Sequence, residues 1–260
     1  MTTVDLDCDL HGPDGSPALL LGGSLGTTRG MWDPQVKALP TDLRIVAFDH
    51  RGHGGSPVPA GPYTIAELGR DVLSLMDRLE ITRASYCGLS IGGMVGQWLA
   101  ANAPERIERL VLICTSAHLP PAETWHGRAA AVRAAGSPAA VADAVVGRWF
   151  TPEWAQRNPD AVSRHRQMVS KTPAEGYASC CEAIAEMDLR AGLRRIAAPT
   201  LVIAGRQDPA TPVEHGEAIA AAVPGARLEV LDDAAHLASV ERAAAVNGLI
   251  ASHLSGAAIR

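Results

Sequence analysis

Ser90 lies in a G-x-S-x-G pattern at residues 88–92, and a serine side chain becomes a nucleophile when a neighbouring base removes its proton. The pattern follows a short apolar run, 84–89, and begins an apolar-periodic stretch, 91–103. This order predicts a sharp strand-to-helix turn, in which glycines tolerate a crowded backbone and the hydroxyl stands at the carboxyl edge of a sheet. Ser90 is therefore the candidate nucleophile of an acyl-transfer reaction.

Such a nucleophile needs a base and an acid that orients the base, and Asp208 and His236 follow later apolar runs of the chain. The order serine, aspartate, histidine suits a nucleophile on a strand-to-helix turn. Nine histidines occur, but only the position of His236, after a strand pattern and before a helix, is that of a base. Asp208 is the predicted acid, and Asp188 and Asp233 are alternatives for that role.

Acyl transfer also requires hydrogen-bond donors where negative charge develops on the carbonyl oxygen. With a nucleophile on this type of turn, one donor is the backbone N–H of the next residue, here Ile91, and another comes from the loop after an earlier strand. That loop is the glycine-rich segment 22–26. We predict an oxyanion hole formed by the N–H groups of Leu25 and Ile91, with Ser24 as the alternative to Leu25.

The elements that must position these residues follow an alternating pattern of strands and helices. Helical periodicity is clear at 65–79, where apolar residues recur at intervals of three and four. Short aliphatic runs bounded by Gly, Pro, Asp or Arg predict buried strands at 18–25, 44–49, 84–89, 110–114, 200–204 and 227–231. The alternation predicts an α/β fold with a mostly parallel central sheet flanked by helices.

One interval, 117–198, breaks this alternation. It lacks a convincing strand, and helical patterns occur at 125–135, 139–150, 160–169 and 175–187. An all-helical insertion after a strand lies over the carboxyl edge of the sheet, where open α/β folds bind ligands. We therefore expect a core formed by 1–116 and 199–260 and a helical cap, or lid, formed by 117–198. The alternative is a larger sheet with strands that the pattern does not reveal.

Composition excludes several classes of function. The chain has 260 residues, is 47% apolar and 20% charged, and carries a formal net charge of −5, which disfavours nucleic acid as a partner. It shows no signal peptide and no apolar run of the ~20 residues that a membrane span requires, so we expect a cytoplasmic protein without a membrane partner. The five cysteines lack zinc-site spacing and are expected to be reduced. No metal, nucleotide or flavin signature is present, and we expect no cofactor.

Several segments together resemble one family. The chain resembles the α/β hydrolases, and among them the 3-oxoadipate enol-lactonases of the β-ketoadipate pathway of aromatic catabolism. Beside the turn at Ser90, the segments that carry this resemblance are 24–28, 31–35, 49–54, 149–152, 176–181 and 187–190. One position departs from the pattern, because enol-lactonases usually have asparagine where this chain has Gly23. Either that amide braces the loop or it contacts the substrate, in which case the substrate differs.

The resemblance implies hydrolysis of an enol-lactone to 3-oxoadipate through an acyl-enzyme, with Ser90, Asp208 and His236 as the catalytic residues. The substrate is a small lactone or ester with a separate carboxylate, so we expect a cation or several donors in the pocket. We expect arginines of the cap to supply them. The alternative role is a solvated surface position for each arginine and packing within the cap for the tryptophans. The candidate substrate contacts are Ser24, Trp125, Arg128, Arg133, Arg148 and Trp149.

Two other interpretations remain open at the level of sequence. The first is another hydrolase on the same scaffold, either an esterase for small carboxylic esters, a perhydrolase or a carbon–carbon hydrolase. The second is a noncatalytic sensor that binds a ligand in the same pocket. A fluorophosphonate probe that labels Ser90 separates an active hydrolase from a sensor, and substrate turnover separates the hydrolases. The oligomeric state does not follow from the sequence.

Overall fold

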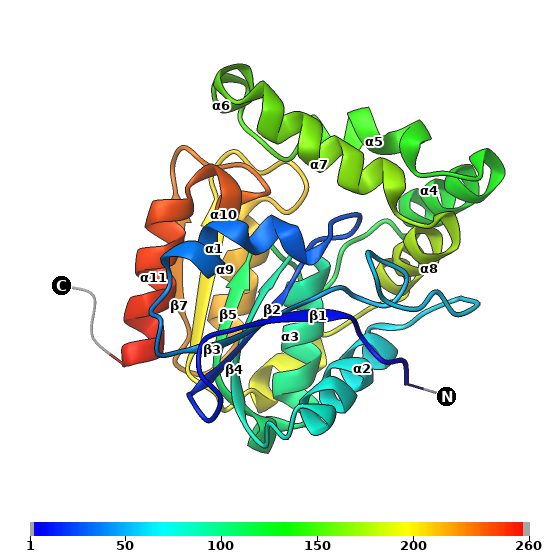
Figure 1. The fold of residues 1–260 in the computed structure, drawn as a ribbon. Helices are drawn as coiled ribbons and strands as arrows, with labels where there is room; N and C mark the ends of the chain where they lie inside the picture. Colours follow the sequence, from blue (N-terminus) through cyan, green and yellow to red (C-terminus); the bar gives the residue numbers. More distant parts are fainter. Residues whose placement is uncertain (1–2, 257–260) are drawn as a thin grey trace.

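The central sheet has seven strands in the order β1-β3-β2-β4-β5-β6-β7, in a computed structural model that describes residues 3–256 (Figure 1). All neighbouring pairs are parallel except β1 with β3. The strands are β1 (Cys8–His11), β2 (Ala18–Gly22), β3 (Arg44–Phe48), β4 (Ala84–Leu89), β5 (Ile107–Ile113), β6 (Thr200–Gly205) and β7 (Arg227–Leu231). The predicted α/β class with a mostly parallel sheet is confirmed.

Helices cover both faces of the sheet (Figure 1). On one face α3 packs against β2, β4 and β5 and is itself covered by α2, while α11 packs against β5 from the other face and contacts α1. The helices of this core are α1 (Asp33–Ala38), α2 (Ile65–Arg78), α3 (Ile91–Asn102), α9 (Val213–Ala222), α10 (Ala238–Glu241) and α11 (Ala243–Ser255). Both faces of the sheet are therefore buried, which explains its nearly continuous aliphatic strands.

The helix α2 illustrates how the sequence forms these elements. Thr64 caps its first turn by accepting a hydrogen bond from the Glu67 N–H at 3.1 Å. The residues that recur at helical spacing, Leu68, Val72 and Leu75, are buried. Capping satisfies a backbone donor that would otherwise have no partner, and burial of the apolar stripe attaches the helix to the core.

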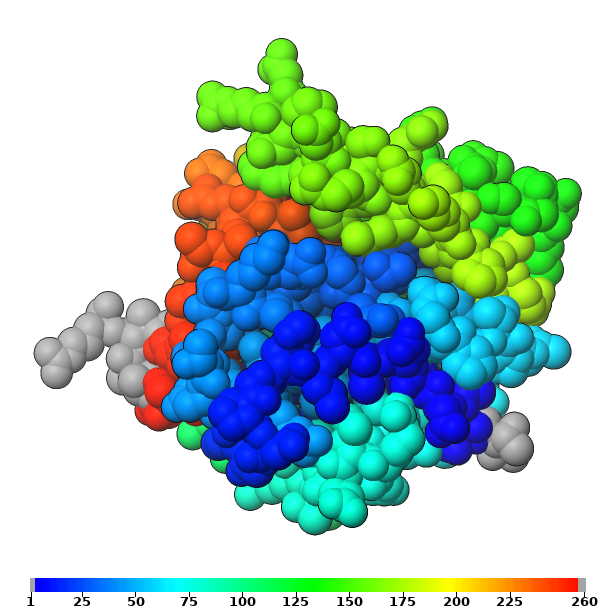
Figure 2. All heavy atoms as spheres, in the orientation of Figure 1, coloured from blue at the N-terminus to red at the C-terminus, as the bar shows by residue number. Residues whose placement is uncertain are grey.

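Residues 117–198 contain helices and no strand, and all of them belong to the described part of the chain. The helices are α4 (Ala122–Ala135), α5 (Ala139–Val146), α6 (Pro152–Arg157), α7 (Pro159–Lys171) and α8 (Ala174–Ala185). They lie together over one end of the molecule (Figures 1 and 2). Residues 117–198, called the cap below, contact both flanking segments of the chain, called the core below. The Leu237 N–H donates to the Trp149 carbonyl, and the Gly61 N–H donates to Glu175.

Several details differ from the sequence-based expectations, among them the strand expected over 18–25, which ends at Gly22. The strand β1 was not expected, because it is short, lies at the sheet edge and has mostly exposed side chains, so it lacks the aliphatic pattern of the others. The helix expected over 139–150 ends at Val146, and the short helix α6, which begins at a proline, was not expected. Within residues 3–256, no helix combines the length and apolar character needed to cross a membrane.

The register of the parallel strands places their carboxyl ends at one edge. Gly22 pairs with Gly88, and Leu89 pairs with Ile113. On the other side of β5, Gly205 pairs with Leu231. Because parallel strands end at a common edge, the loops that carry the glycine-rich segment, Ser90, Asp208 and His236 all begin there.

Candidate active site

Ser90 occupies a strained turn between β4 and α3. Its backbone has φ +57° and ψ −118°, a conformation that residues other than glycine rarely adopt. The flanking glycines are required by close backbone contacts, since a Cβ at Gly88 would lie 2.2 Å from the Gly92 carbonyl oxygen and one at Gly92 would lie 2.1 Å from the Gly22 carbonyl oxygen. The Ser90 carbonyl accepts a hydrogen bond from the Thr115 hydroxyl at 2.7 Å, which fixes the turn further.

The predicted acid and base are in contact. The His236 Nδ1–H donates to the Asp208 Oδ2 at 2.8 Å, and both side chains are almost completely buried. Because Nδ1 is engaged, Nε2 is the ring nitrogen that remains to accept a proton. Asp208 follows β6 by three residues, and His236 lies between β7 and α10, so two adjacent strand ends bring the pair together.

The Asp208 carboxylate is held as an anion. Burial alone raises the pKa of this carboxyl, but the adjacent His236 and hydrogen bonds from Thr211 outweigh burial, so that the pKa lies below its ordinary value. Its oxygens accept from the Ala210 N–H at 2.8 Å, the Thr211 N–H at 3.1 Å and the Thr211 hydroxyl at 2.6 Å. A carboxylate fixed in this way holds one tautomer of the imidazole.

The predicted oxyanion donors are the N–H of Leu25, in the glycine-rich loop, and the N–H of Ile91, at the start of α3. In the loop, the N–H groups on either side of Leu25 are occupied. The Ser24 N–H donates to the Met31 sulfur at 3.3 Å, and the Gly26 N–H donates to His53 Nε2 at 2.9 Å. By contrast, the N–H groups of Leu25 and Ile91 donate to no acceptor among residues 3–256. These two donors are therefore available to a ligand.

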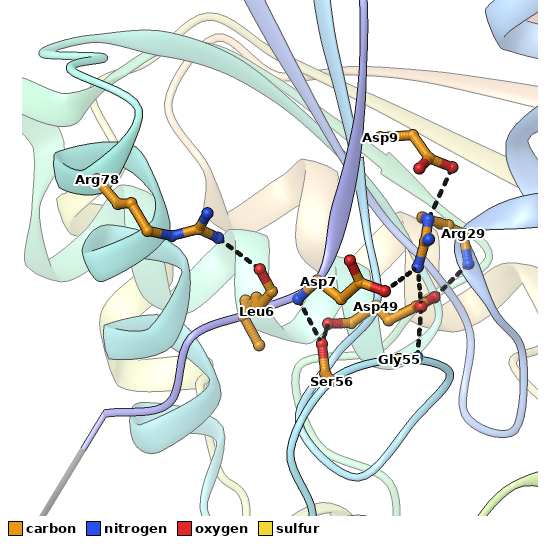
Figure 3. A network of polar contacts seen from close by, with 8 residues as sticks. All are labelled: Leu6, Asp7, Asp9, Arg29, Asp49, Gly55, Ser56 and Arg78. Carbon is orange, nitrogen blue, oxygen red and sulfur yellow. Dashed lines mark hydrogen bonds and ion pairs between the residues drawn. The ribbon is translucent and has the colours of Figure 1, made fainter.

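The same loop is anchored to the rest of the core by a network of carboxylates around Arg29 (Figure 3). Its guanidinium forms ion pairs with Asp7 at 2.9 Å, with Asp9 at 2.7 Å and with the buried Asp49. Asp49 also accepts from the Arg29 N–H at 2.6 Å and from the Gly55 N–H at 3.0 Å. The network joins β1 and the loop after β3 to the end of the oxyanion loop.

Gly23 is the position at which the sequence departs from the enol-lactonase pattern that it resembles, and its surroundings leave little room for a side chain. A Cβ here would lie 2.8 Å from the Thr27 hydroxyl and 3.0 Å from the Met31 sulfur. The Thr27 hydroxyl instead donates to the Ser24 carbonyl at 2.7 Å. In this chain, Thr27 and Met31 thus fill the space and brace the loop.

A cavity of about 190 Å³ lies between the core and the cap. Its core wall includes Ser24, Leu25, Ser90 and His236, and its cap wall includes residues from α4, α8 and the segment after α5.

Within the described chain, no group of three or more histidine, cysteine or acidic side chains is arranged to hold a metal ion. All five cysteines are free thiols, and burial raises the pKa of each of them.

Four of the five cap residues expected to contact substrate line this cavity. These are Trp125, Arg128, Arg148 and Trp149. The fifth, Arg133, is not among the lining residues: its guanidinium is paired with the carboxylates of Glu175, at 2.9 Å, and Glu182. Arg133 follows Arg128 by five residues on α4, and this spacing places the two side chains on different sides of the helix.

Three polar residues of the site were not expected from the sequence. Thr211 holds Asp208, and Glu241 accepts from the Ala235 N–H at 2.8 Å and the Thr151 N–H at 2.9 Å, which ties the histidine loop to the cap. Tyr177 lines the cavity from α8. The position of Thr211, three residues after Asp208, is a signal from which its role could have been predicted. No local sequence pattern distinguishes Glu241 from a glutamate on an exposed helix.

The arrangement of sheet, turn and Asp–His pair is that of an α/β hydrolase. A model of the alpha/beta hydrolase fold family matches residues 17–243, and the chain belongs to this family. It is 42% identical over 244 residues to 3-oxoadipate enol-lactonase 2 of Acinetobacter baylyi, which covers 94% of this chain and 91% of the relative.

Solved structures show the same similarity. The enol-lactonase from Burkholderia xenovorans is 43% identical with a TM-score of 0.94, and the match covers 97% of each chain. A hydrolase from Pseudomonas aeruginosa is 49% identical with a TM-score of 0.93, over 96% of this chain and 94% of that one. The resemblance inferred from sequence motifs is therefore confirmed.

Proposed function

We propose that this chain hydrolyses 3-oxoadipate enol-lactone to 3-oxoadipate through a Ser90 acyl-enzyme. The observation that carries the proposal is a single cavity in which Ser90, His236 and the Leu25 loop face two arginines of the cap. The similarity to enol-lactonases over nearly the whole chain supports the same substrate. We also propose the division into a core, 1–116 and 199–260, and a cap, 117–198.

In the proposed reaction His236 removes the proton of Ser90 as the hydroxyl attacks the lactone carbonyl. The N–H groups of Leu25 and Ile91 hold the oxyanion of the tetrahedral intermediate, and Asp208 keeps the imidazole in the required tautomer. Ring opening expels an enolate, which leaves more easily than an alkoxide and then ketonises. His236 next activates a water molecule that hydrolyses the Ser90 ester.

The lactone carries a carboxylate away from the reacting carbon, and the cap wall supplies positive charge for it. Arg128 and Arg148 line the cavity, and neither forms an ion pair in the part of the chain that the structure describes. Two guanidinium groups without a carboxylate partner attract an anionic ligand. The proposed substrate thus has its carbonyl at the core wall and its carboxylate at the cap wall.

Turnover of purified enzyme with the enol-lactone tests this function. We expect kcat/KM of about 10⁵ M⁻¹s⁻¹ or more for the lactone, and much lower values for 4-nitrophenyl acetate and for carbon–carbon ring-fission products. Labelling of Ser90 by a fluorophosphonate is expected as well. Preference for an aryl ester or a ring-fission product would identify a different hydrolase, and the absence of both labelling and turnover would identify a sensor.

A further inference from the structure

The Tyr177 hydroxyl is a buried polar group without a partner. Tyr177 lies on α8, has no exposed surface, and lines the same cavity as Ser90. Its hydroxyl oxygen has no hydrogen bond of good geometry to any described residue, and its O–H has no acceptor among them. A buried hydroxyl without a partner is destabilising, because the folded protein loses its hydrogen bond to water and gains none. A hydroxyl of this kind in a cavity wall therefore points to a ligand atom.

The surroundings of this hydroxyl define the chemistry of that atom. Burial raises the pKa of Tyr177, and the positive charges of Arg128 and Arg148, with the Arg128 guanidinium near the phenol oxygen as a donor, oppose this only in part. The phenol therefore stays neutral, and its own O–H can donate. Burial lowers the pKa of Arg148, and the like charge of Arg128 lowers it further. The two cations are thus close enough to repel each other, and an anion between them would relieve this repulsion.

The positions of the three residues make this a defined site. Arg128 is held above the Trp125 ring at 4.6 Å, and the Arg148 Nε–H donates to the Ala144 carbonyl at 3.2 Å. The Tyr177 ring packs beside the oxyanion loop, where a Cβ at Gly26 would lie 3.0 Å from a ring carbon. The phenol therefore has little freedom to turn away from the cavity.

We propose that Tyr177, Arg128 and Arg148 form a carboxylate subsite in which the Tyr177 hydroxyl donates to one carboxylate oxygen and the guanidinium groups neutralise the charge. The subsite selects anionic lactones and esters over neutral ones of the same shape. This inference rests on the proposed function for its substrate, but binding at the subsite requires no turnover. Tyr177 is thus a specificity residue that contacts substrate.

The test compares two ligands of nearly equal shape, hexanoate and hexanamide, by isothermal titration calorimetry of the intact enzyme. We expect wild-type protein to bind hexanoate more tightly, and Tyr177→Phe to reduce the ratio of the two affinities about tenfold, the effect of one charge-assisted hydrogen bond. Arg128→Gln is expected to reduce the ratio at least as much. Arg157→Gln removes an exposed cap arginine that pairs with Glu153, and should keep the wild-type ratio.

The stability of Tyr177→Phe provides a second readout. Removal of a hydroxyl without a partner should leave the urea midpoint of the free protein unchanged or raise it. The proposal is overturned if wild-type enzyme does not prefer hexanoate, or if Tyr177→Phe keeps the wild-type ratio. Failure of lactone turnover with intact hexanoate selectivity would instead contradict the proposed function and leave the subsite standing.

Discussion

At the scale of single residues, the site depends on how each side chain is held. Ser90 sits in a backbone conformation that close contacts at Gly88 and Gly92 impose, and Asp208 is fixed by four hydrogen bonds, one of them from His236. The strain is offset by the surrounding core, since β4 and α3 are almost entirely buried. The proposed function of Ser90 as a nucleophile therefore depends on its position, because the contacts at Gly88 and Gly92 fix the backbone that carries its hydroxyl.

Replacement of Ser90 by alanine should lower kcat by roughly 10⁴ or more, because the nucleophile and its base act as one unit. The fold should be retained, since alanine has no oxygen to place and fills less space. Steady-state kinetics with the lactone and circular dichroism measure the two effects. A fully active alanine variant would contradict the role of this serine.

Replacement of Asp208 by asparagine should lower kcat by about 10³ to 10⁴, because an amide donor favours the wrong imidazole tautomer. Asp188→Asn is the matched control: Asp188 was an alternative acid, and it lies at the surface in an ion pair with Arg190. Kinetics of both variants decide between the two acids. An equal loss in the control would transfer the role to Asp188.

At the scale of elements, the cap helix α8 and the loop after β3 approach each other through paired glycines. A Cβ at Gly176 would lie 2.2 Å from the Gly52 carbonyl oxygen, and one at Gly52 would lie 2.4 Å from the Gly176 Cα. The loop after β3 also carries His53, whose Nε2 accepts a hydrogen bond from the Gly26 N–H of the oxyanion loop. This contact joins segments 49–54 and 176–181, which are far apart in sequence and both carry the family resemblance.

Substitution of Gly176 by alanine should lower the free energy of unfolding by about 1 to 3 kcal/mol, because the added methyl group meets backbone that cannot move aside. It should also raise KM for the lactone, since Tyr177 moves with α8. Gly127→Ala on α4 is the control: its Cβ meets nothing within 4 Å, and it should gain about 0.5 to 1 kcal/mol. Urea unfolding measures both, and equal stabilities would refute the glycine contact.

At the scale of the whole molecule, several histidines are buried in the neutral form. Burial lowers the pKa of His50 to about 3, with a further contribution from the neighbouring His53, and burial also lowers the pKa of His53 and of His165. In the unfolded chain these groups take up protons near pH 6.5. The unfolded state therefore binds more protons than the folded state as the pH falls, and stability is lost.

The expected result is full stability above about pH 7 and a progressive fall from pH 6.5 downward, which for His50 continues to about pH 3. Carboxylates such as Glu175, whose hydrogen bonds with Arg133 lower its pKa to about 2, lose their contribution only below pH 4.5. The change in stability between pH 6.5 and pH 5 therefore comes from the buried histidines. Urea midpoints across this window should fall, and His165→Gln should flatten the slope. Urea midpoints that stay constant between pH 6.5 and pH 5 would contradict the conclusion that these histidines are neutral in the folded protein.

Much of this protein follows from the sequence alone. Local hydrophobic periodicity determined the parallel strands, the main helices and the helical interval 117–198. Burial of one stripe of a helix, or of both faces of a strand, produces an apolar pattern that repeats within a few residues. The turn at Ser90 and the loop positions of Asp208 and His236 follow from the same patterns, since parallel strands end at one edge. The assignment of these three as catalytic residues stays a prediction until kinetics test it.

Only the tertiary structure decided which cap side chains face the cavity. Arg128 and Arg133 share one helix and one chemistry, yet the first lines the cavity while the second is paired with Glu175 and Glu182. The edge strand β1, the buried Glu241 and the unpaired Tyr177 hydroxyl likewise left no local signal. The physical reason is range: periodicity acts over a few residues, whereas the partner of a side chain is set by packing between segments far apart in the chain.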